Sequence, residues 1–266
     1  MENDYKCVLT VADIRKYMAN ANVIAFDYET APDEKFRDEE KAALDPAKSH
    51  VVGCSFSVKE HTGIYVPVAH KVGRNIDNHE FWKFMAEFLG NRKITKVAHN
   101  LAFESMFSYA KNIVILPPVY DTIAAAQLTQ KGNTEFRKLG DCGLKKLAVE
   151  LCKEPLPSFN DVTGGRSFDE LNGEDQETVR YGAADSDFAL RLMHIFNGWF
   201  EEFLPKHKWL AENVESPTAV YLGIMKVNGV PINLDLMLER KAEAEKAMQT
   251  VKENIAFIIG DINIGS

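Results

Sequence analysis

The sequence lacks the residue patterns that mark several common protein classes. Its four cysteines, Cys7, Cys54, Cys142 and Cys152, form no Cys-x-x-Cys pair, and its seven histidines lie at no close spacing to them. A zinc site is therefore not expected, and without a secretory segment we expect reduced thiols in a cytosol. No apolar run approaches the ~20 residues of a membrane-spanning helix, and the N-terminal segment does not resemble a signal peptide.

An excess of positive charge is also missing. The 266 residues include 31 Lys and Arg against 39 Asp and Glu, which gives a formal net charge of −8. This balance argues against a protein that coats a polyanion along a basic face, although a local site can still bind one. With 45% hydrophobic and 26% charged residues, the composition is that of a folded protein with a large core.

Strand-like and helix-like segments alternate in the first half of the chain. A polar turn at 59–62 joins two strand-like runs as a hairpin, whose strands must be antiparallel. Apolar residues at helical spacing predict a helix over 78–89 with Asn78 as its N-cap, and another helix begins near Ala102. We therefore expect an α/β domain with a mixed sheet. Short apolar runs predict its strands at 23–26, 51–58, 63–68 and 94–98.

From residue 121 onward the pattern is mainly helical. Proline and glycine residues predict a loop over 153–168. The last helix carries an apolar stripe that must pack against something, and the segment after residue 204 contains helices alone. We therefore divide the chain into an α/β domain over 1–204 and an all-helical segment over 205–266. The helices are expected at 121–130, 144–151, 173–196, 209–227 and 234–258.

Acidic residues lie at three places where predicted elements begin or end. Asp27 and Glu29 end the first strand, and because residues two apart in a strand share a face, both can point at one site. Glu104 lies in the first turn of the helix after the fourth strand, and Tyr181 and Asp185 share a helix face. The small residues between Tyr181 and Asp185 allow their helix to approach the sheet closely. Each place alone is explained as well by a solvated turn, a helix cap or a surface charge. Together, four carboxylates and a phenol predict a site for a hard divalent cation.

These three segments resemble the exonuclease motifs of the DEDD superfamily. The resemblance rests on Asp27-x-Glu29, AsnLeuAlaPheGlu at 100–104 and Tyr181-x-x-x-Asp185, and the tyrosine indicates the tyrosine branch. Within that superfamily the chain resembles the 3′–5′ proofreading exonuclease domain of family A, DNA polymerase I-like enzymes of bacteria and phages. Residues 209–266 resemble the start of the polymerase domain, so 205–266 is expected to be an incomplete part of one.

The resemblance implies a ribonuclease H-like fold, with a mixed five-stranded sheet and helices on both faces. It also implies two divalent ions, Mg²⁺ or Mn²⁺, ~3.5–4 Å apart. Asp27 would bridge both ions, Glu29 and Asp185 would complete the first, and Glu104 would serve the second. Tyr181 and Glu29 would orient the attacking water. The implied activity is metal-dependent removal of 5′-mononucleotides from the 3′ end of single-stranded or frayed DNA, as in proofreading.

Glu104 departs from the family pattern, which has Asp at this position. The extra methylene moves the carboxylate by ~1.5 Å, and a misplacement of ~1 Å can cost ~100-fold in rate. Two alternatives to an active DNA exonuclease therefore stay open. One is a weakened exonuclease-like domain that binds single-stranded DNA or serves as a structural module. The other is an RNA 3′ exonuclease.

Three further residues are candidates for substrate binding. Asn100 and Phe103 match motif positions near the terminal nucleotide, while a helix cap and a core side chain explain them equally well. Thr30 can donate to a phosphate or serve as a cap. The implied partners are the 3′ end of single-stranded DNA and a polymerase domain, in cis or as a separate subunit, with no membrane. We expect the protein in the cytoplasm of a bacterium or of a phage-infected host.

Overall fold

The computed structural model describes residues 3–132 and 142–260 of the chain. By their contacts the residues form two compact units, Met1–Val227 and Asn228–Ser266. All of the predicted site residues belong to the first unit. The boundary expected between residues 204 and 205 rests on a resemblance to a family, and the contacts that define these two units do not test it. It stays a prediction.

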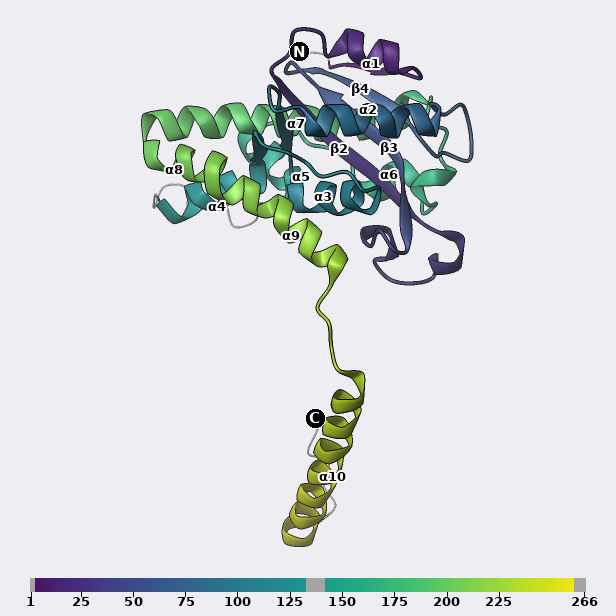
Figure 1. Ribbon diagram of the computed structural model, residues 1–266, viewed down its shortest axis with the longest axis vertical. Helices are drawn as coiled ribbons and strands as arrows, with labels where there is room; N and C mark the ends of the chain where they lie inside the picture. The colour runs from purple at the N-terminus through teal and green to yellow at the C-terminus, as the bar shows by residue number, and fades with distance from the viewer. Residues whose placement is uncertain (1–2, 133–141, 261–266) are drawn as a thin grey trace. The chain divides into compact units, whose positions relative to one another are not determined.

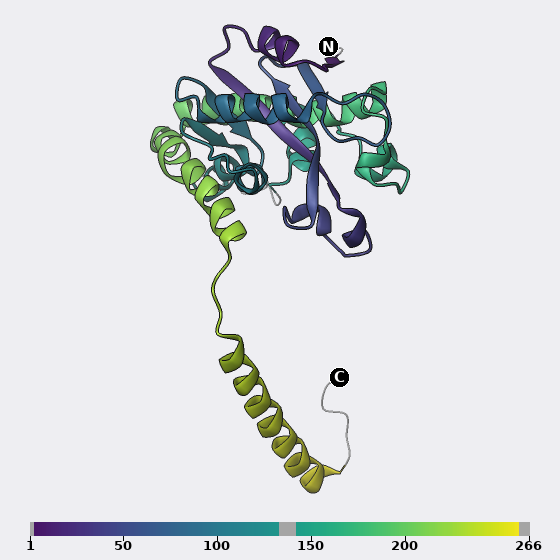
Figure 2. The same ribbon diagram turned by 45° about the vertical axis from the view of Figure 1, so that its right-hand side comes forward.

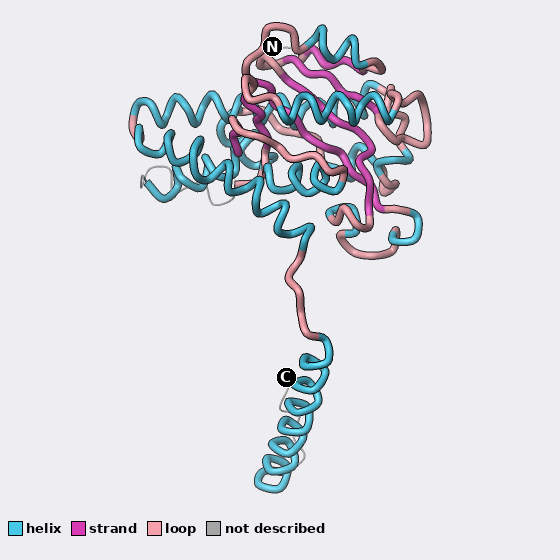
Figure 3. Tube along the Cα trace, viewed as in Figure 1, coloured by secondary structure: helices cyan, strands magenta, loops and turns pink. Residues whose placement is uncertain are grey.

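Among the described residues, six strands form one mixed sheet in the first unit (Figures 1 and 3). Their order is β1-β4-β3-β2-β5-β6, in which β3 is antiparallel to β2 and β4 and the other neighbouring pairs are parallel. The sheet is mixed as expected, but the expected number of five strands was wrong by one. The strands are β1 (Asp4–Cys7), β2 (Val23–Pro32), β3 (Ser49–Ser57), β4 (Thr62–Pro67), β5 (Thr95–Ala98) and β6 (Val119–Asp121).

No apolar run predicted the two edge strands, β6 beside β5 and β1 beside β4. In β1 the Tyr5 hydroxyl donates to Asp187 Oδ2 at 2.6 Å, and Arg191 forms an ion pair with the same carboxylate. The two hydrogen-bonded residues are 182 positions apart in the chain. Because these distant contacts hold β1, its local sequence pattern did not predict it.

Helices cover both faces of the sheet. In Figure 1, α2 crosses one face, and the same arrangement is visible after rotation in Figure 2. The helix expected over 209–227 is divided into α8, a π-helical turn at Ala211–Glu215, and α9. The helices named in this unit are α1 (Val11–Tyr17), α2 (Asn78–Gly90), α3 (Leu101–Ala110), α4 (Thr122–Gly132), α5 (Leu144–Leu147), α6 (Phe159–Thr163), α7 (Gln176–Glu202), α8 (Pro205–Leu210) and α9 (Ser216–Asn228).

Two local expectations needed correction. The segment 153–168 is not entirely loop, because Ser158 and Asp161 form a capping box that starts α6 within it. The N-cap of α2 is Asp77 rather than Asn78, since the Asp77 side chain accepts the Glu80 N–H at 2.9 Å. In both cases a short polar side chain satisfies a backbone donor at the first turn of a helix.

The alternation of side chains along β2 separates two layers of the core. Ile24, Phe26 and Tyr28 pack in the cluster that contains the apolar faces of α1, α2 and α3. Ala25 packs on the opposite face, in the cluster that contains residues of α4 and α7. Because successive strand residues alternate between faces, Asp27 and Glu29 lie on the face covered by α7.

The second unit consists of one helix in the described part of the chain, α10 (Leu234–Ile259). Its N-terminus is capped by Asn233, whose side chain accepts the Leu236 N–H at 3.0 Å. Residues 261–266, the end of the expected helical segment, lie outside the described residues. No described helix of either unit is long and apolar enough to cross a membrane.

Candidate active site

Three of the four predicted metal ligands come together at one point. One carboxylate oxygen from each of Asp27, Glu29 and Asp185 lies within 4.8 Å of the other two. The first two come from one face of β2, and the third comes from α7, which packs across the sheet. All three side chains are partly buried. Oxygen ligands gathered in this way suit Mg²⁺ or another hard divalent cation.

The strand β2 is irregular where the first motif ends. Its register with β3 shifts between Glu29 and Thr30, so that Glu29 pairs with Gly53 and Thr30 pairs with Val51. A bulge of this kind bends a strand and changes the direction in which a side chain points. The irregularity therefore lies next to one of the three converging carboxylates.

Small residues let α7 approach the sheet closely, as the sequence predicted. A Cβ atom at Gly182 would lie 2.5 Å from the Tyr65 ring, so any larger residue would force the helix away. Ala183 and Ala184 are buried beside it. The close packing brings Tyr181 and Asp185, one helical turn apart, to the carboxylates of β2.

Burial and mutual repulsion raise the pKa values of the clustered carboxyl groups. Burial, followed by the charge of Asp185, raises the pKa of Asp27 well above its usual value. Burial and then the charges of Asp27 and Asp185 do the same for the pKa of Glu29. Burial raises the pKa of Asp185 from 3.8 to about 6. The cluster therefore binds protons readily when no cation compensates its negative charge.

Tyr181 contributes a protonated phenol to the cluster. Burial is the main reason that its pKa is raised, and the negative charges of Glu29, Asp185 and Asp27 add to the effect. The ring packs against Phe168 at 5.6 Å between centroids, which fixes its position. At neutral pH this hydroxyl can donate a hydrogen bond.

Glu104 lies beside the three carboxylates but is not one of the group. It is 1% exposed, and its Oε2 atom has no hydrogen-bond partner. Burial, then the charges of Asp27 and Glu29, raises its pKa well above the usual value, while a hydrogen bond from the Tyr28 backbone lowers it. A buried carboxylate oxygen without a partner is costly, and a cation or a proton would satisfy it.

The predicted substrate-binding residues have different surroundings. Asn100 is exposed at the N-cap position of α3 in a left-handed conformation, and its side chain forms no capping hydrogen bond. Phe103 is partly buried and packs against Phe107 at 4.8 Å between ring centroids. Thr30 donates its hydroxyl proton to Ala43 O at 2.7 Å, which gives it a structural contact. The contacts of all three with substrate stay predictions.

Sequence reasoning assigned no role to two residues that position the site. Asp121 is buried at the end of β6, and its carboxylate accepts the N–H groups of Asn100 and Leu101, each at 3.1 Å. It thereby fixes the start of the helix that carries Glu104. Lys145 of α5 places its ammonium 5.2 Å from the centroid of the Tyr181 ring. The sequence pattern predicted no strand before residue 121 and no neighbour for Lys145, so it indicated neither role.

Comparison with known proteins agrees with this geometry. A family model described as 3′–5′ exonuclease, of family A DNA polymerases, matches residues 6–198. The chain belongs to this 3′–5′ exonuclease family. It is 28% identical over 235 residues to DNA polymerase I of Chloroflexus aurantiacus, covering 86% of this chain and 22% of that protein. It is 25% identical over 279 residues to DNA polymerase I of Pseudomonas aeruginosa, covering 100% of this chain and 28% of that protein.

Several solved structures share the fold of this chain. A complex of the Pol1 POL domain from M. smegmatis with DNA primer-template and dNTP aligns with a TM-score of 0.70 at 14% identity, covering 96% of this chain and 37% of that one. Escherichia coli RNase D gives 0.59 at 14% identity, covering 85% and 52%. Brucella melitensis NrnC with bound Mg²⁺ gives 0.56 at 18% identity, covering 87% and 98%. The ribonuclease H-like fold expected from the sequence is confirmed.

Proposed function

We propose that this 3′–5′ exonuclease chain removes 5′-mononucleotides from the 3′ end of single-stranded or frayed DNA. The convergence of Asp27, Glu29 and Asp185, whose oxygens lie within 4.8 Å of one another, carries the proposal. The family match and the DNA polymerase I relatives support the direction of hydrolysis and the choice of DNA. The chain spans 22% and 28% of those relatives, so their other activities are not assigned to it.

The residues present fit divalent cations. Buried Glu29 Oε1 and Glu104 Oε2 have no hydrogen-bond partner, and the nearby carboxyl groups repel one another. Asp27, Glu29 and Asp185 would hold one ion, and Asp27 with Glu104 would hold a second. Two Mg²⁺ or Mn²⁺ ions, when bound, supply a nucleophilic water and stabilise the charge on both oxygens of the displaced phosphodiester.

The protein's own groups orient the reactants around that point. Tyr181 stays protonated because its pKa is raised by burial and by Glu29, and it can donate to the attacking water. The Glu29 carboxylate can accept a proton of the same water. Lys145 is the cation that lowers the pKa values of Glu29 and Asp185. Its ammonium can attract the phosphate of the 3′ nucleotide.

RNA is the second candidate substrate. Two solved structures with this fold are Escherichia coli RNase D, an exoribonuclease involved in structured RNA processing, and Brucella melitensis NrnC bound to pGG. At sequence identities of 14% and 18%, these structures show only that the fold is shared. DNA is the substrate we favour, because the relatives matched by sequence are DNA polymerases.

The function is tested with 5′-labelled single-stranded DNA and RNA of one sequence, incubated with the full chain and Mg²⁺, Mn²⁺ or chelator. We expect a metal-dependent ladder on DNA that is absent for the Asp27→Asn/Glu29→Gln variant. The matched control is Asp4→Asn/Glu87→Gln, which changes two exposed acids on β1 and α2. Faster degradation of RNA would replace DNA by RNA in the proposal. Substrate left intact under every metal condition would show that the chain is a binding or structural module.

Lys145→Met is expected to change metal and DNA binding in opposite directions at pH 8. Without the nearby ammonium, which repels a bound cation, the carboxylates should bind Mn²⁺ about three- to tenfold more tightly. This factor corresponds to a change of ~1 kcal/mol in the free energy of binding. The KM for DNA should rise by a similar factor, because the phosphate loses an attraction. Mn²⁺ titrations and steady-state kinetics measure both, with the exposed neighbour Lys146→Met as control. Unchanged values for Lys145→Met would contradict its assigned role.

As partners we propose the 3′ end of single-stranded DNA and a polymerase domain, in cis or as a separate subunit, that hands over this end. The DNA polymerase I relatives, which are much longer than the part matched here, support the second partner. Residues 205–266 would form the start of that domain. We place the activity in the cytoplasm.

A further inference from the structure

Hydrogen bonds connect the start of α9 to the start of α3, the helix that carries Glu104. Ser216, the first residue of α9, is fully buried, and its hydroxyl oxygen accepts the Asp121 N–H at 2.8 Å. The Asp121 carboxylate in turn accepts the N–H groups of Asn100 and Leu101 at the N-terminus of α3. The first residue of α9 therefore helps to fix the helical turn in which Glu104 lies.

The two helices also touch directly within that turn. The Ser105 hydroxyl, on the residue after Glu104, donates to Val220 O at 2.8 Å. A Cβ atom at Gly223 would collide with Ala102 O and would lie 2.7 Å from Ser105 Cβ. Because a packed interior has no room for such an overlap, any larger residue at position 223 would push α3 and α9 apart.

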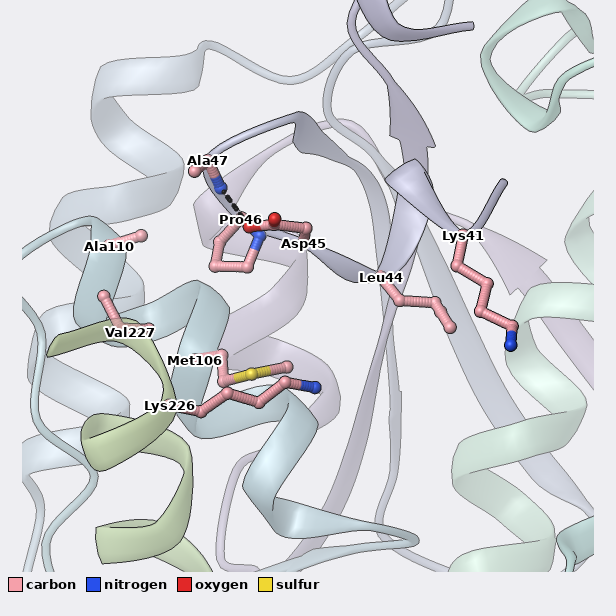
Figure 4. A pocket seen from close by; sticks show the side chains of 9 residues that line it. All are labelled: Lys41, Leu44, Asp45, Pro46, Ala47, Met106, Ala110, Lys226 and Val227. Carbon is pink, nitrogen blue, oxygen red and sulfur yellow. Dashed lines mark hydrogen bonds between the residues drawn. The ribbon is translucent and has the colours of Figure 1, made fainter. Parts of the chain in front are cut away.

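The C-terminal ends of the two helices are less closely fitted. Met106 and Ala110 of α3 line a pocket of about 390 Å³ together with Lys226 and Val227 of α9 (Figure 4). The hydrogen bonds and the close approach described above lie instead in the N-terminal half of α3, which carries Glu104. The tightest contacts of α9 with α3 are therefore made around this carboxylate.

Glu104 has little freedom to compensate for a movement of α3. Its side chain is 1% exposed and accepts a hydrogen bond from the Tyr28 backbone, while its Oε2 atom has no partner. In a close-packed interior, a shift of the helix carries such a side chain with it. A displacement of ~1 Å in a catalytic group can cost ~100-fold in rate.

We propose that Ser216 and Gly223 are positioning residues, which hold Glu104 where it binds the second divalent cation. The proposal rests on the proposed exonuclease function for the assignment of that cation. Both residues lie beyond the segment 6–198 that the exonuclease family model matches. The functional nuclease would accordingly extend to Val227, where the first compact unit ends.

Mn²⁺ binding to the full chain tests the proposal without hydrolysis, by electron paramagnetic resonance of the free ion. We expect two Mn²⁺ sites in the parent chain, one of which is weakened by Glu104→Gln. Gly223→Ala and Ser216→Ala should each weaken this same site about 10-fold, as changes in the residues that support a metal ligand do, and leave the other site unchanged. The controls are Gly198→Ala, where a Cβ atom would meet nothing within 4 Å, and Thr218→Ala on the exposed side of α9.

Hydrolysis of labelled single-stranded DNA tests whether the effect acts through Glu104. We expect Gly223→Ala to lower kcat about 10-fold at low Mn²⁺, to recover at high Mn²⁺ and to leave the KM for DNA unchanged. In the Glu104→Gln chain the same change should lower the residual rate no further, because the residue through which Gly223 acts has already been altered.

The outcomes separate positioning from packing. Equal weakening of both Mn²⁺ sites, or the same loss of rate with and without Glu104→Gln, would show that α9 only packs against α3 and would overturn the proposal. A parent chain that binds a single Mn²⁺ would overturn it as well. If one site is weakened selectively while the parent chain hydrolyses neither DNA nor RNA, the exonuclease function fails and the positioning role stands. Ser216→Ala, which adds no atoms, decides the question if Gly223→Ala does not fold.

Discussion

Asp185→Asn should lower metal-dependent hydrolysis by on the order of 10³-fold, because the stabilisation that a catalytic metal supplies amounts to several kcal/mol. Asp185 is the one member of the three-carboxylate group that comes from α7, so its loss leaves a two-carboxylate site on β2 alone. The amide keeps the size of the side chain and removes its charge. The expected loss is therefore one of cation binding and not of packing.

The measurement compares single-turnover rates on 5′-labelled DNA across a Mn²⁺ titration. Asp4→Asn, which changes an exposed acid on β1, is the matched control. Partial rescue at high Mn²⁺ would fit a site that has lost one ligand. Wild-type rates at ordinary Mn²⁺ would mean that Asp185 does not hold the ion, and the site would have to be assigned to other carboxylates.

The same substitution should raise the free energy of unfolding of the metal-free protein, by an amount that grows with pH. The pKa of Asp185 is raised from 3.8 to about 6, so its stabilising contribution is complete below pH 3.8 and is lost as the pH rises through 6. A shift of this size corresponds to about 2–3 kcal/mol. In chelator, the advantage of Asp185→Asn over wild type in free energy of unfolding should grow between pH 4 and 7. Saturating Mn²⁺ should reverse the difference, because it stabilises the wild type more strongly.

Much of this site followed from local geometry. The period of two in a strand predicted that Asp27 and Glu29 share a face, and the structure confirms it. Small residues before Asp185 predicted a close approach of α7, which Gly182 makes possible against Tyr65. Both inferences depend only on residues that are close in sequence. In a strand these residues decide which way a side chain points, and in a helix they decide how closely its face can pack.

Features that depend on distant contacts could not be predicted in this way. Strand β1 is held by the hydrogen bond of Tyr5 with Asp187, across nearly the whole domain. The position of Lys145 near Tyr181 depends on how α5 packs beside α7, which no spacing reveals. Such placements need the tertiary structure.

The role of Glu104 is the main open question about the site, because this residue departs from the family pattern and is buried beside the other carboxylates. It is buried, its Oε2 has no partner, and it lies close enough to Asp27 and Glu29 for their charges to raise its pKa. One interpretation is that Glu104 holds the second cation despite the longer side chain. The other is that it stays protonated and only fills space, as in a weakened nuclease. The two interpretations make different predictions for an isosteric change.

Glu104→Gln is expected to reduce hydrolysis by about 10²-fold or more, because the amide cannot supply the negative charge that the second cation requires. Its metal-free form should lose less stability as the pH rises above 4.5, since the carboxyl group with the raised pKa is gone. Glu87→Gln, on the exposed side of α2, is the control. A fully active Glu104→Gln would show that the residue only fills space.

Glu104→Asp tests the effect of side-chain length while the negative charge is kept. It keeps the negative charge, restores the residue that the family pattern has, and removes one buried methylene at a cost of about 1 kcal/mol in the free energy of unfolding. Because the backbone of α3 is fixed by Asp121 through the N–H groups of Asn100 and Leu101, the helix cannot easily move to bring a shorter side chain forward. We therefore expect Glu104→Asp to be slower than wild type but faster than Glu104→Gln in single-turnover assays. Activity above wild type would instead mean that the longer side chain holds the carboxylate too close for the second cation.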